Sequence, residues 1–369
     1  MKKIVFGITS LTLGGAERVL VDIANELSKK YDITIFTIYS KGELEKQLNK
    51  NIKLESIYDC SFLELNRIRK KLVPIKILLL KNRMYKKYIN NKYDIEIAFL
   101  EGAITRIFSC GKSKKKKIVW IHNDIEKVFG KSLKAILKRH IDKKVYNKFS
   151  NLIFVSNDNK KSFEKVYEMY NKKQVIYNYI DRQKVIEKSK EKLSEEFNNN
   201  TINFVTVSRL VEQKAIDRLI KIHSRLIKEE FYHKIYVVGD GPLKEKLKEQ
   251  IIKEKVEETF ILLGKKENPY PYIKEADYFC LLSYFEGYPM VLEEAKILNK
   301  DILITNTAAR ETIANYKKGQ VLENSEEDIY IGLKNIIKNG KIEEVQNVNK
   351  EKEYNNTHII NQIIDLIEK

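Results

Sequence analysis

The chain has 369 residues, of which 43% are hydrophobic and 33% charged, and its formal net charge at pH 7 is +18. This length exceeds one ordinary core and predicts two domains of about 150–200 residues each, and the composition excludes a largely disordered chain. The basic excess lies entirely in one half: residues 1–180 carry a net charge of +20 and the remainder −2. This asymmetry indicates an anionic partner for the first half, a lipid surface or a nucleic acid, unless the lysines are simply solvated.

Three cysteines, Cys60, Cys110 and Cys280, lie far apart without metal-ligand spacing, which predicts free thiols in a reducing compartment. The first residues have the outline of a signal peptide, but polar residues interrupt the apolar stretch and an amphipathic helix follows, so we expect a first strand and its loop. No apolar run approaches the ~20 residues that a membrane-spanning helix needs. We therefore expect a cytoplasmic protein, soluble or peripherally bound to a membrane.

Short apolar runs alternate with amphipathic helical patterns along the chain, which is typical of parallel α/β domains. A helix is expected at 16–29, where apolar residues recur every three or four positions. The strands expected in the first half are 3–7, 33–38, 95–99, 118–121 and 152–155. Those expected in the second half are 204–207, 235–238, 260–263, 278–281 and 302–304. The polar segment 181–201 separates the halves, and a terminal helix is expected at about 351–369.

The most informative motif runs from Glu286 to Glu294, after the expected strand 278–281. A loop carries Glu286, and a helix is expected near Pro289, whose missing N–H costs nothing at a helix start. Eight helical steps would separate the two carboxylates by roughly 12 Å, comparable to the reach from a sugar to the ribose of a nucleotide-sugar. Free N–H groups at the helix start suit the diphosphate between them. Two glutamates alone equally fit a solvated helix face, so the interpretation depends on the strand–loop–helix setting.

Two cations, Arg209 and Lys214, follow the expected strand 204–207. In doubly wound sheets ligands bind at the carboxyl ends of the strands, where both side chains are expected to lie. Two cations there can neutralise a departing nucleoside diphosphate, as a metal ion does elsewhere. For either residue alone, an ordinary surface position fits as well.

Three further segments complete a pattern: Gly14-Gly15-Ala16-Glu17-Arg18, Asn178-Tyr179-Ile180-Asp181 and Val238-Gly239-Asp240-Gly241-Pro242. Together with the motifs at 209–214 and 286–294, and in this order, they make the chain resemble the family 4 retaining glycosyltransferases of the GT-B fold. The resemblance implies an α/β fold of two doubly wound, Rossmann-like parallel-sheet domains facing a central cleft. Residues 1–180 would form the acceptor-side domain and 181–350 the nucleotide-sugar-binding domain, with the C-terminal helix packing back on the first.

The same resemblance implies roles for single residues. Arg209 and Lys214 would bind the donor diphosphate, Glu286 the transferred sugar and Glu294 the ribose. Backbone groups would lie against sugar and phosphate at Gly287, Tyr288, Pro289 and Met290. Two glycines would let the first loop approach the diphosphate, because they lack a side chain: Gly14 and Gly15.

His122, after the expected strand 118–121, would orient or polarise the transferred sugar; a purely structural histidine is the alternative. The family implies retention of the anomeric configuration, with the departing diphosphate assisting deprotonation of the acceptor. No Asp-x-Asp motif stands in a metal-binding setting, so we expect neither a required divalent cation nor another cofactor. Uridine is the expected base only because it is the commonest.

The sequence departs from the family pattern at several turns. Ala215 stands where glycine is frequent, and Tyr179 follows Asn178 where glycine is usual. Residues 307–311 replace a common glycine pair, and 299–301 lack the usual glycine and proline. These changes concern turn geometry and the seating of the donor sugar, so they leave its identity open.

The segment 67–81 mixes basic and apolar side chains as a helix on a membrane surface does. Arg67, Arg69, Lys70 and Lys71 supply much of its charge, and each basic side chain near an anionic surface contributes about 1 kcal/mol. The segment 127–148 is similarly mixed. We expect this domain to lie at the inner face of the membrane and receive a polyprenyl-diphosphate-linked glycan, as in capsule or lipopolysaccharide assembly. A core helix with a solvated basic edge is the alternative.

Two other classes of function stay open on the sequence. A nucleotide-sugar epimerase or hydrolase on the same fold would form its products without a lipid acceptor. A non-enzymatic, basic nucleic-acid-binding protein would show strong, salt-sensitive binding to DNA or RNA, although no recognisable nucleic-acid module is present.

Overall fold

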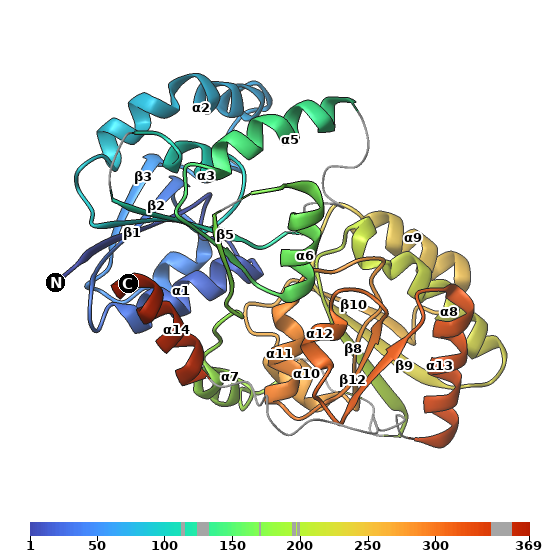
Figure 1. Ribbon diagram of the computed structural model, residues 1–369. Coiled ribbons are helices and arrows are strands. Elements are labelled where there is room, and N and C mark those ends of the chain that lie inside the picture. Colours follow the sequence, from blue (N-terminus) through green and yellow to red (C-terminus); the bar gives the residue numbers. More distant parts are fainter. Residues whose placement is uncertain (112–114, 124–132, 170, 194–196, 198–199, 341–355) are drawn as a thin grey trace. The chain divides into compact units, whose positions relative to one another are not determined.

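The structure is a computed structural model that describes residues 1–111, 115–123, 133–169, 171–193, 197, 200–340 and 356–369. The chain divides into two compact units: unit 1 is Met1–Tyr179 with Asn356–Lys369, and unit 2 is Ile180–Asn355. The structure places the boundary between Tyr179 and Ile180, one residue before the position expected from the sequence, which was between residues 180 and 181. Each unit is an α/β domain around one parallel sheet (Figure 1).

Unit 1 is built on a seven-stranded sheet in the order β3-β2-β1-β4-β5-β6-β7. The strands are β1 Lys3–Ile8, β2 Asp32–Tyr39, β3 Lys53–Tyr58, β4 Ile95–Ala98, β5 Lys116–Ile121, β6 Asn151–Phe154 and β7 Lys172–Val175. The strand order reverses between β1 and β4, so the loops that follow these two strands meet at the carboxyl edge.

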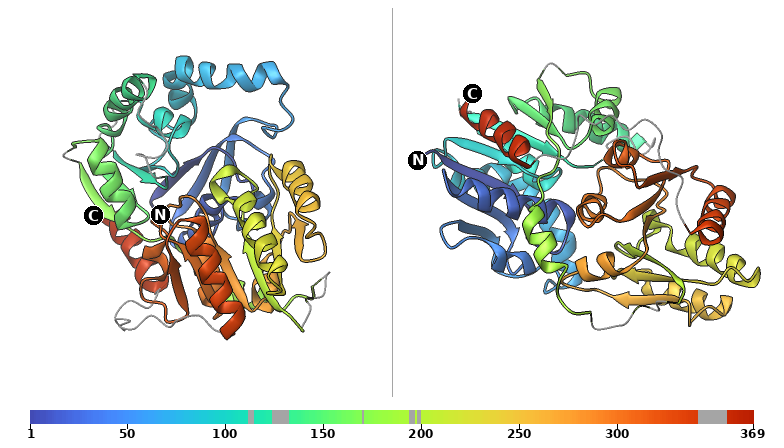
Figure 2. Two further views of the ribbon diagram at one scale, coloured as in Figure 1. Left: turned by 90° about the vertical axis from the view of Figure 1, so that its right-hand side faces the viewer. Right: turned by 90° about the horizontal axis from the view of Figure 1, so that it is seen from below.

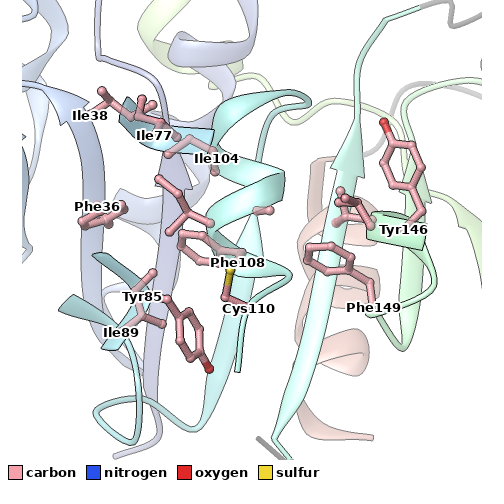
Figure 3. Packing of buried hydrophobic residues seen from close by; sticks show 14 of the residues in the cluster. Phe36, Ile38, Ile77, Tyr85, Ile89, Ile104, Phe108, Cys110, Tyr146 and Phe149 are labelled. Carbon is pink, nitrogen blue, oxygen red and sulfur yellow. The ribbon is translucent and has the colours of Figure 1, made fainter. Parts of the chain in front are cut away.

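Helices cover both faces of this sheet. Their bounds are α1 Gly15–Leu27, α2 Arg67–Tyr88, α3 Ala103–Phe108, α5 Leu133–Tyr146, α6 Asn157–Val166 and α14 Asn356–Glu368. On one face Phe36 of β2, Tyr85 of α2 and Phe108 of α3 lie within one buried cluster (Figure 3). The two ends of the chain lie close together in both views of Figure 2, because Glu368 of α14 pairs with Lys2 and accepts a hydrogen bond from the Tyr31 hydroxyl at 2.7 Å.

Unit 2 holds a six-stranded sheet in the order β10-β9-β8-β11-β12-β13. The strands are β8 Ile202–Val207, β9 His233–Val238, β10 Phe260–Gly264, β11 Tyr278–Leu281, β12 Asp301–Thr305 and β13 Gly319–Leu322. The helices are α7 Arg182–Lys188, α8 Ile216–Lys228, α9 Lys244–Glu254, α10 Tyr270–Glu275, α11 Met290–Ile297, α12 Arg310–Ile313 and α13 Glu326–Asn339. Here the strand order reverses between β8 and β11.

Successive residues of a strand in unit 2 point into two separate cores. Phe204 of β8 packs with residues of α8, α9 and α13, whereas the next residue, Val205, packs with residues of α7, α10 and α11. A strand buried on both faces must be apolar throughout, which explains the continuous apolar runs of the sequence.

Every strand expected from the sequence is present, with ends that differ by at most two residues. Three strands were not expected: β3, β7 and β13. Each lies at the edge of its sheet and is partly exposed, so its sequence carries polar residues. Among the described helices, none combines the length and apolar character needed to cross a bilayer.

Candidate active site

The loops after β8 and β11 are bound together at the point where the strand order of unit 2 reverses. The backbone N–H of Tyr284 donates to the Gln213 carbonyl at 2.9 Å, and the Gln213 side-chain amide donates to the Phe285 carbonyl at 2.9 Å. These two bonds fix the loop that carries Lys214 against the loop that carries Glu286. Ligands of doubly wound sheets bind at this kind of position.

Lys214 and Glu286 form an ion pair between these loops. The Lys214 Nζ lies 2.6 Å from the Glu286 Oε1, and the side chains are only 14% and 6% exposed. An ion pair with so little water around it is strong in Coulombic terms but costly in desolvation, and it is weak evidence for a stabilising role. The pair therefore indicates a site that presents a cation and a hydrogen-bond acceptor side by side.

Arg209 lies on the same loop as Lys214, and its side chain is exposed. Two glycines of the neighbouring β9 loop let that loop pack against the β8 loop. A Cβ on Gly239, whose φ is +152°, would lie 1.8 Å from the Ser208 carbonyl oxygen, and one on Gly241 would lie 2.4 Å from that of Leu210. The motif at 238–242 thus sets the position of the Arg209 loop.

The helix of the glutamate motif begins at Met290, with Pro289 in extended conformation immediately before it. Residues 286–289 are not helical. The separation of roughly 12 Å between the two carboxylates assumed eight helical steps, and that assumption is wrong. Glu294, on α11, is 6% exposed and accepts a hydrogen bond from the Tyr270 hydroxyl of α10 at 3.1 Å. Tyr288 turns inward and donates to Glu293 at 2.7 Å, and Gly287 is partly exposed.

In unit 1 the loop after β1 ends at Gly14, which precedes the first residue of α1, Gly15. Gly14 has extended backbone, with φ −132°, so no left-handed conformation requires a glycine here. A Cβ on Gly14 would lie 2.2 Å from the Glu17 carboxylate, a flexible group that can move.

His122 follows β5 at the carboxyl edge of the same sheet. Burial lowers the pKa of its imidazole to about 3, and a hydrogen bond with the Phe99 backbone partly opposes this shift. The ring is therefore neutral at pH 7. Its Nε2 is buried and has no hydrogen-bond partner among the described residues. A buried nitrogen without a partner is costly, so it suits a ligand hydroxyl.

Glu101, which sequence reasoning missed, holds the His122 loop. Its Oε1 accepts the backbone N–H of His122 at 2.7 Å and of Asn123 at 2.8 Å, and its Oε2 accepts the Asn123 side-chain amide at 3.1 Å. Burial raises the pKa of the carboxyl, and these hydrogen bonds oppose the shift. The signal in the sequence is a carboxylate directly before Gly102, whose φ is +94°, just after a buried strand.

The segment 67–81 belongs to α2, which has two apolar faces. Val73, Ile77, Met84 and Tyr85 are buried against the rest of unit 1. A second row faces solvent at intervals of four, three and four residues, with exposed fractions of 69%, 53%, 54% and 74%: Ile68, Leu72, Ile75 and Leu79. We call this row the outer stripe.

Arg67, Arg69 and Lys71 are exposed beside the outer stripe, and Lys70 lies over the Phe62 ring at 5.3 Å. Of the other mixed segment, the part before residue 133 lies outside the described residues, and α5 begins at Leu133. The buried row fits the alternative of a core helix with a solvated basic edge, and the outer stripe is a second apolar row outside that core.

Comparisons with known proteins show the family and the fold. Residues 187–354 match the family model of glycosyl transferases group 1, and residues 13–184 match that of glycosyltransferase family 4. The chain belongs to the family 4 glycosyltransferases. The GT-B fold expected from the resemblance is confirmed as two parallel-sheet α/β domains.

Two relatives and one solved structure illustrate the similarity of this glycosyltransferase to known proteins. An uncharacterized glycosyltransferase of Methanocaldococcus jannaschii is 29% identical over 219 residues, 57% of this chain and about half (53%) of that protein. The N-acetylgalactosamine-N,N'-diacetylbacillosaminyl-diphospho-undecaprenol 4-alpha-N-acetylgalactosaminyltransferase of Campylobacter jejuni is 27% identical over 93% of this chain and 92% of that one. The crystal structure of Anabaena HepE with UDP and glucose shares the fold, with a TM-score of 0.73, 15% identity and 100% and 99% coverage.

Of the three functional classes considered from the sequence, the comparisons support glycosyl transfer. Relatives of this glycosyltransferase act on lipid-linked glycans, as the Campylobacter name states.

Proposed function

We propose that this glycosyltransferase moves a sugar from a UDP-sugar, with retention of configuration, onto a polyprenyl-diphosphate-linked glycan in the synthesis of capsule, lipopolysaccharide or another surface polysaccharide. The observation that carries the proposal is the Lys214–Glu286 pair at the β8/β11 reversal point. It offers a cation for a phosphate oxygen and an acceptor for a sugar hydroxyl within bonding distance of each other. A sugar diphosphate has both groups side by side.

In the proposed reaction, the bond between the anomeric carbon and the β-phosphate oxygen breaks. A bond from that carbon to an acceptor hydroxyl oxygen forms on the same face, and the hydroxyl proton passes to the departing diphosphate. Arg209 and Lys214 stabilise the charge on the diphosphate, so no divalent cation is required. Glu286 holds the sugar, Glu294 the ribose, and the neutral His122 accepts from a sugar hydroxyl. Backbone groups complete the donor site at Gly14, Gly15, Gly287, Tyr288, Pro289 and Met290.

A donor screen tests this proposal. A matching nucleotide-sugar should raise the thermal unfolding temperature of the wild type and of Lys221→Gln, a control for an exposed lysine of α8. Lys214→Gln should lose most of that shift, because the variant has no cation for the diphosphate. HepE binds UDP, which places UDP-sugars first in the screen. Protection that is unchanged in Lys214→Gln, or activity abolished by a chelator and restored by manganese, would contradict the donor site proposed here.

We further propose that α2 rests on the inner face of the membrane, where the lipid-linked acceptor is held. The exposed outer stripe suits burial at the boundary of headgroups and acyl chains, and the arginines and lysines beside it suit anionic headgroups. Four basic side chains at about 1 kcal/mol each correspond to a change in vesicle partitioning of roughly three orders of magnitude. The Campylobacter relative acts on a diphospho-undecaprenol-linked saccharide by its name, which supports the same class of acceptor.

Sedimentation with vesicles of anionic phospholipid tests the membrane surface. The variant Arg67→Gln/Arg69→Gln/Lys70→Gln/Lys71→Gln and the variant Leu72→Ser/Ile75→Ser/Leu79→Ser should both lose vesicle binding. A control that removes as many charges from α9, Lys244→Gln/Lys246→Gln/Lys248→Gln/Lys253→Gln, should bind as the wild type does. If the α2 variants sediment with the vesicles as the wild type does, the proposal that α2 binds the membrane is wrong.

A further inference from the structure

A hollow of about 740 Å³ opens at the amino-terminal edge of the sheet in unit 1. The first residues of three strands line it: Lys116 of β5, Asn151 of β6 and Lys172 of β7. The last turns of α14 form another wall, with Gln362 and Asp365 among its residues. Because the loops of Glu101 and His122 follow the other ends of the strands, the hollow is separate from the candidate active site.

The lining of this hollow carries an excess of positive charge. Among the lining side chains, four lysines, 115, 116, 172 and 369, stand against one carboxylate, that of Asp365, which already pairs with the Lys369 ammonium at 2.8 Å. The Lys115 ammonium lies 3.9 Å from the Asp94 carboxylate. Two positive charges, those of Lys116 and Lys172, are left without an ion pair in the part of the chain that the structure describes.

Lys116 is partly buried and Lys172 is exposed, and their positive charges repel each other. Lys116 donates to the Leu366 carbonyl of α14, a neutral acceptor. Burial lowers the pKa of the Lys116 ammonium, and the charges of Lys172 and Lys2 lower it further. An anion between the two ammonium groups would remove this repulsion and gain two charge-assisted hydrogen bonds.

Neutral donors are available around the lysines. The Asn151 side-chain oxygen accepts from the Ser150 hydroxyl at 2.9 Å, so the amide nitrogen of Asn151 is left to donate. Gln174 and Gln362 also line the hollow. A ligand with several oxygens around one centre, at a charge of −2 or more, matches two ammonium groups and a set of amide donors.

We propose that this hollow is a second ligand site, which binds a small soluble anion of the phosphate class through Lys116 and Lys172. The bound anion links the amino-terminal ends of β5 and β7 to α14. Occupancy therefore stabilises the docking of the last helix on unit 1.

Pyrophosphate binding tests the proposal, measured by calorimetry and thermal unfolding in the full chain carrying Lys214→Gln, which weakens the proposed donor site. In this background Lys116→Gln/Lys172→Gln should bind at least 10-fold more weakly, and the shift in unfolding temperature should disappear. Lys172→Gln alone should give a partial loss; it has no bond to α14 among the described contacts, so it leaves the fold intact. Lys161→Gln on α6 is the matched control, and affinity should fall as salt rises.

Equal pyrophosphate affinity in the lysine variants and in the control would overturn the proposal. Loss of binding to phosphatidylglycerol vesicles in Lys116→Gln/Lys172→Gln, with pyrophosphate binding unchanged, would overturn the assignment to a soluble anion. Sugar transfer by the wild type is measured separately, so failure of this second site and failure of the proposed reaction give different results.

Discussion

The Lys214 ammonium and the Glu286 carboxylate are each almost fully removed from solvent, and each is the other's ion-pair partner. They lie 72 positions apart in the sequence, and the strand-following motifs predicted that both belong to one site but not that they pair with each other. The strand order of the sheet makes β8 and β11 neighbours, and their loops then meet at the carboxyl edge. At the scale of residues, the chemistry of the site depends on this one pair.

Removing one partner of this pair should be worse than removing both. Lys214→Ala leaves a buried carboxylate without a counter-charge, which should lower the free energy of unfolding by about 3 kcal/mol. Lys214→Ala/Glu286→Ala should lose clearly less than the sum of the two single variants, because no charge is then left buried. Urea unfolding of the four proteins measures the coupling, and strictly additive losses would contradict it.

Glu101 should act as a positioning residue for His122. In Glu101→Ala the oxygens that accept three N–H groups are removed, so the His122 loop loses its fixed place. We expect kcat to fall about 10-fold or more, since a loss of 1.4 kcal/mol in the transition state corresponds to a factor of ten, with a much smaller change in the KM for the donor. Glu168→Ala, at an exposed position of unit 1, is the control. If the Glu101 variant loses thermal stability but keeps its kcat, Glu101 has only a structural role.

At the scale of elements, two loops of unit 2, one after β8 and one before β12, depend on backbone conformations that few residues adopt. Ala215, with φ 52°, and Asn299, with φ 57°, are both left-handed. Ala215 stands where the family pattern frequently has glycine, and Asn299 belongs to the segment 299–301 that lacks the usual glycine and proline. Glycine adopts this conformation without strain, and asparagine is the next most tolerant residue. These departures from the family pattern therefore preserve the turns, at a cost of about 1–2 kcal/mol for Ala215.

Substitutions at two glycines of unit 2 can separate the cost of a strained backbone conformation from the cost of a steric clash with a neighbouring loop. Gly264 has φ +72° and open space around it, whereas Gly239 has φ +152° and the Ser208 carbonyl in the place of a Cβ. Gly264→Ala should cost about 1 kcal/mol from conformation alone. Gly239→Ala should cost about 3 kcal/mol or more, because strain and overpacking add, and it should also weaken donor binding by displacing the Arg209 loop. Equal costs in denaturant titrations of the two variants would contradict this account.

The sequence predicted the central strands well and the edges poorly, for a physical reason. A central strand such as β12 is buried on both faces, so its sequence is a run of apolar residues. The edge strand β7, Lys172–Val175, is partly exposed to solvent, and its sequence is mostly polar. The candidate site divides in the same way. Motifs that follow strands located Lys214, Glu286 and His122, but the Glu101 carboxylate is recognised only through the backbone N–H groups that it accepts.

At the scale of the whole molecule, unit 2 contains a buried relay of two histidines. The His223 Nδ1 lies 2.8 Å from the His233 Nε2, and the His233 Nδ1 lies 2.8 Å from the Phe231 carbonyl. The carbonyl can only accept, so His233 donates to it and accepts from His223. Burial lowers the pKa of His223 to about 2 and that of His233 to about 4, and the two rings repel each other when charged. Both rings are neutral in the folded protein at pH 7.

This relay should make the protein sensitive to mild acid. Below about pH 6.5 the unfolded chain binds protons at both histidines and the folded chain does not, so stability falls as the pH falls. Between pH 7.5 and 5.5 the pair should remove about 2.7 kcal/mol from the free energy of unfolding, because a window centred on the unfolded pKa of about 6.5 gives about 1.36 kcal/mol for each histidine. Urea unfolding at the two pH values measures the loss. His122, whose pKa burial lowers to about 3, adds a similar loss in unit 1. His223→Gln should therefore remove about 1.4 kcal/mol of the total loss, and His140→Gln, at an exposed position, should leave it unchanged; a pH-independent wild type would refute the expectation.

The return of α14 to unit 1 has a consequence for synthesis on the ribosome. Residues 180–355 are translated in full before the helix that completes the first domain has emerged. Nascent chains usually fold from the amino terminus onward, but here the amino-terminal domain keeps an uncovered apolar surface, facing Ile363 and Leu366 of the folded protein, until α14 has been synthesised. A stop codon ahead of α14 would thus destabilise the domain that was made first.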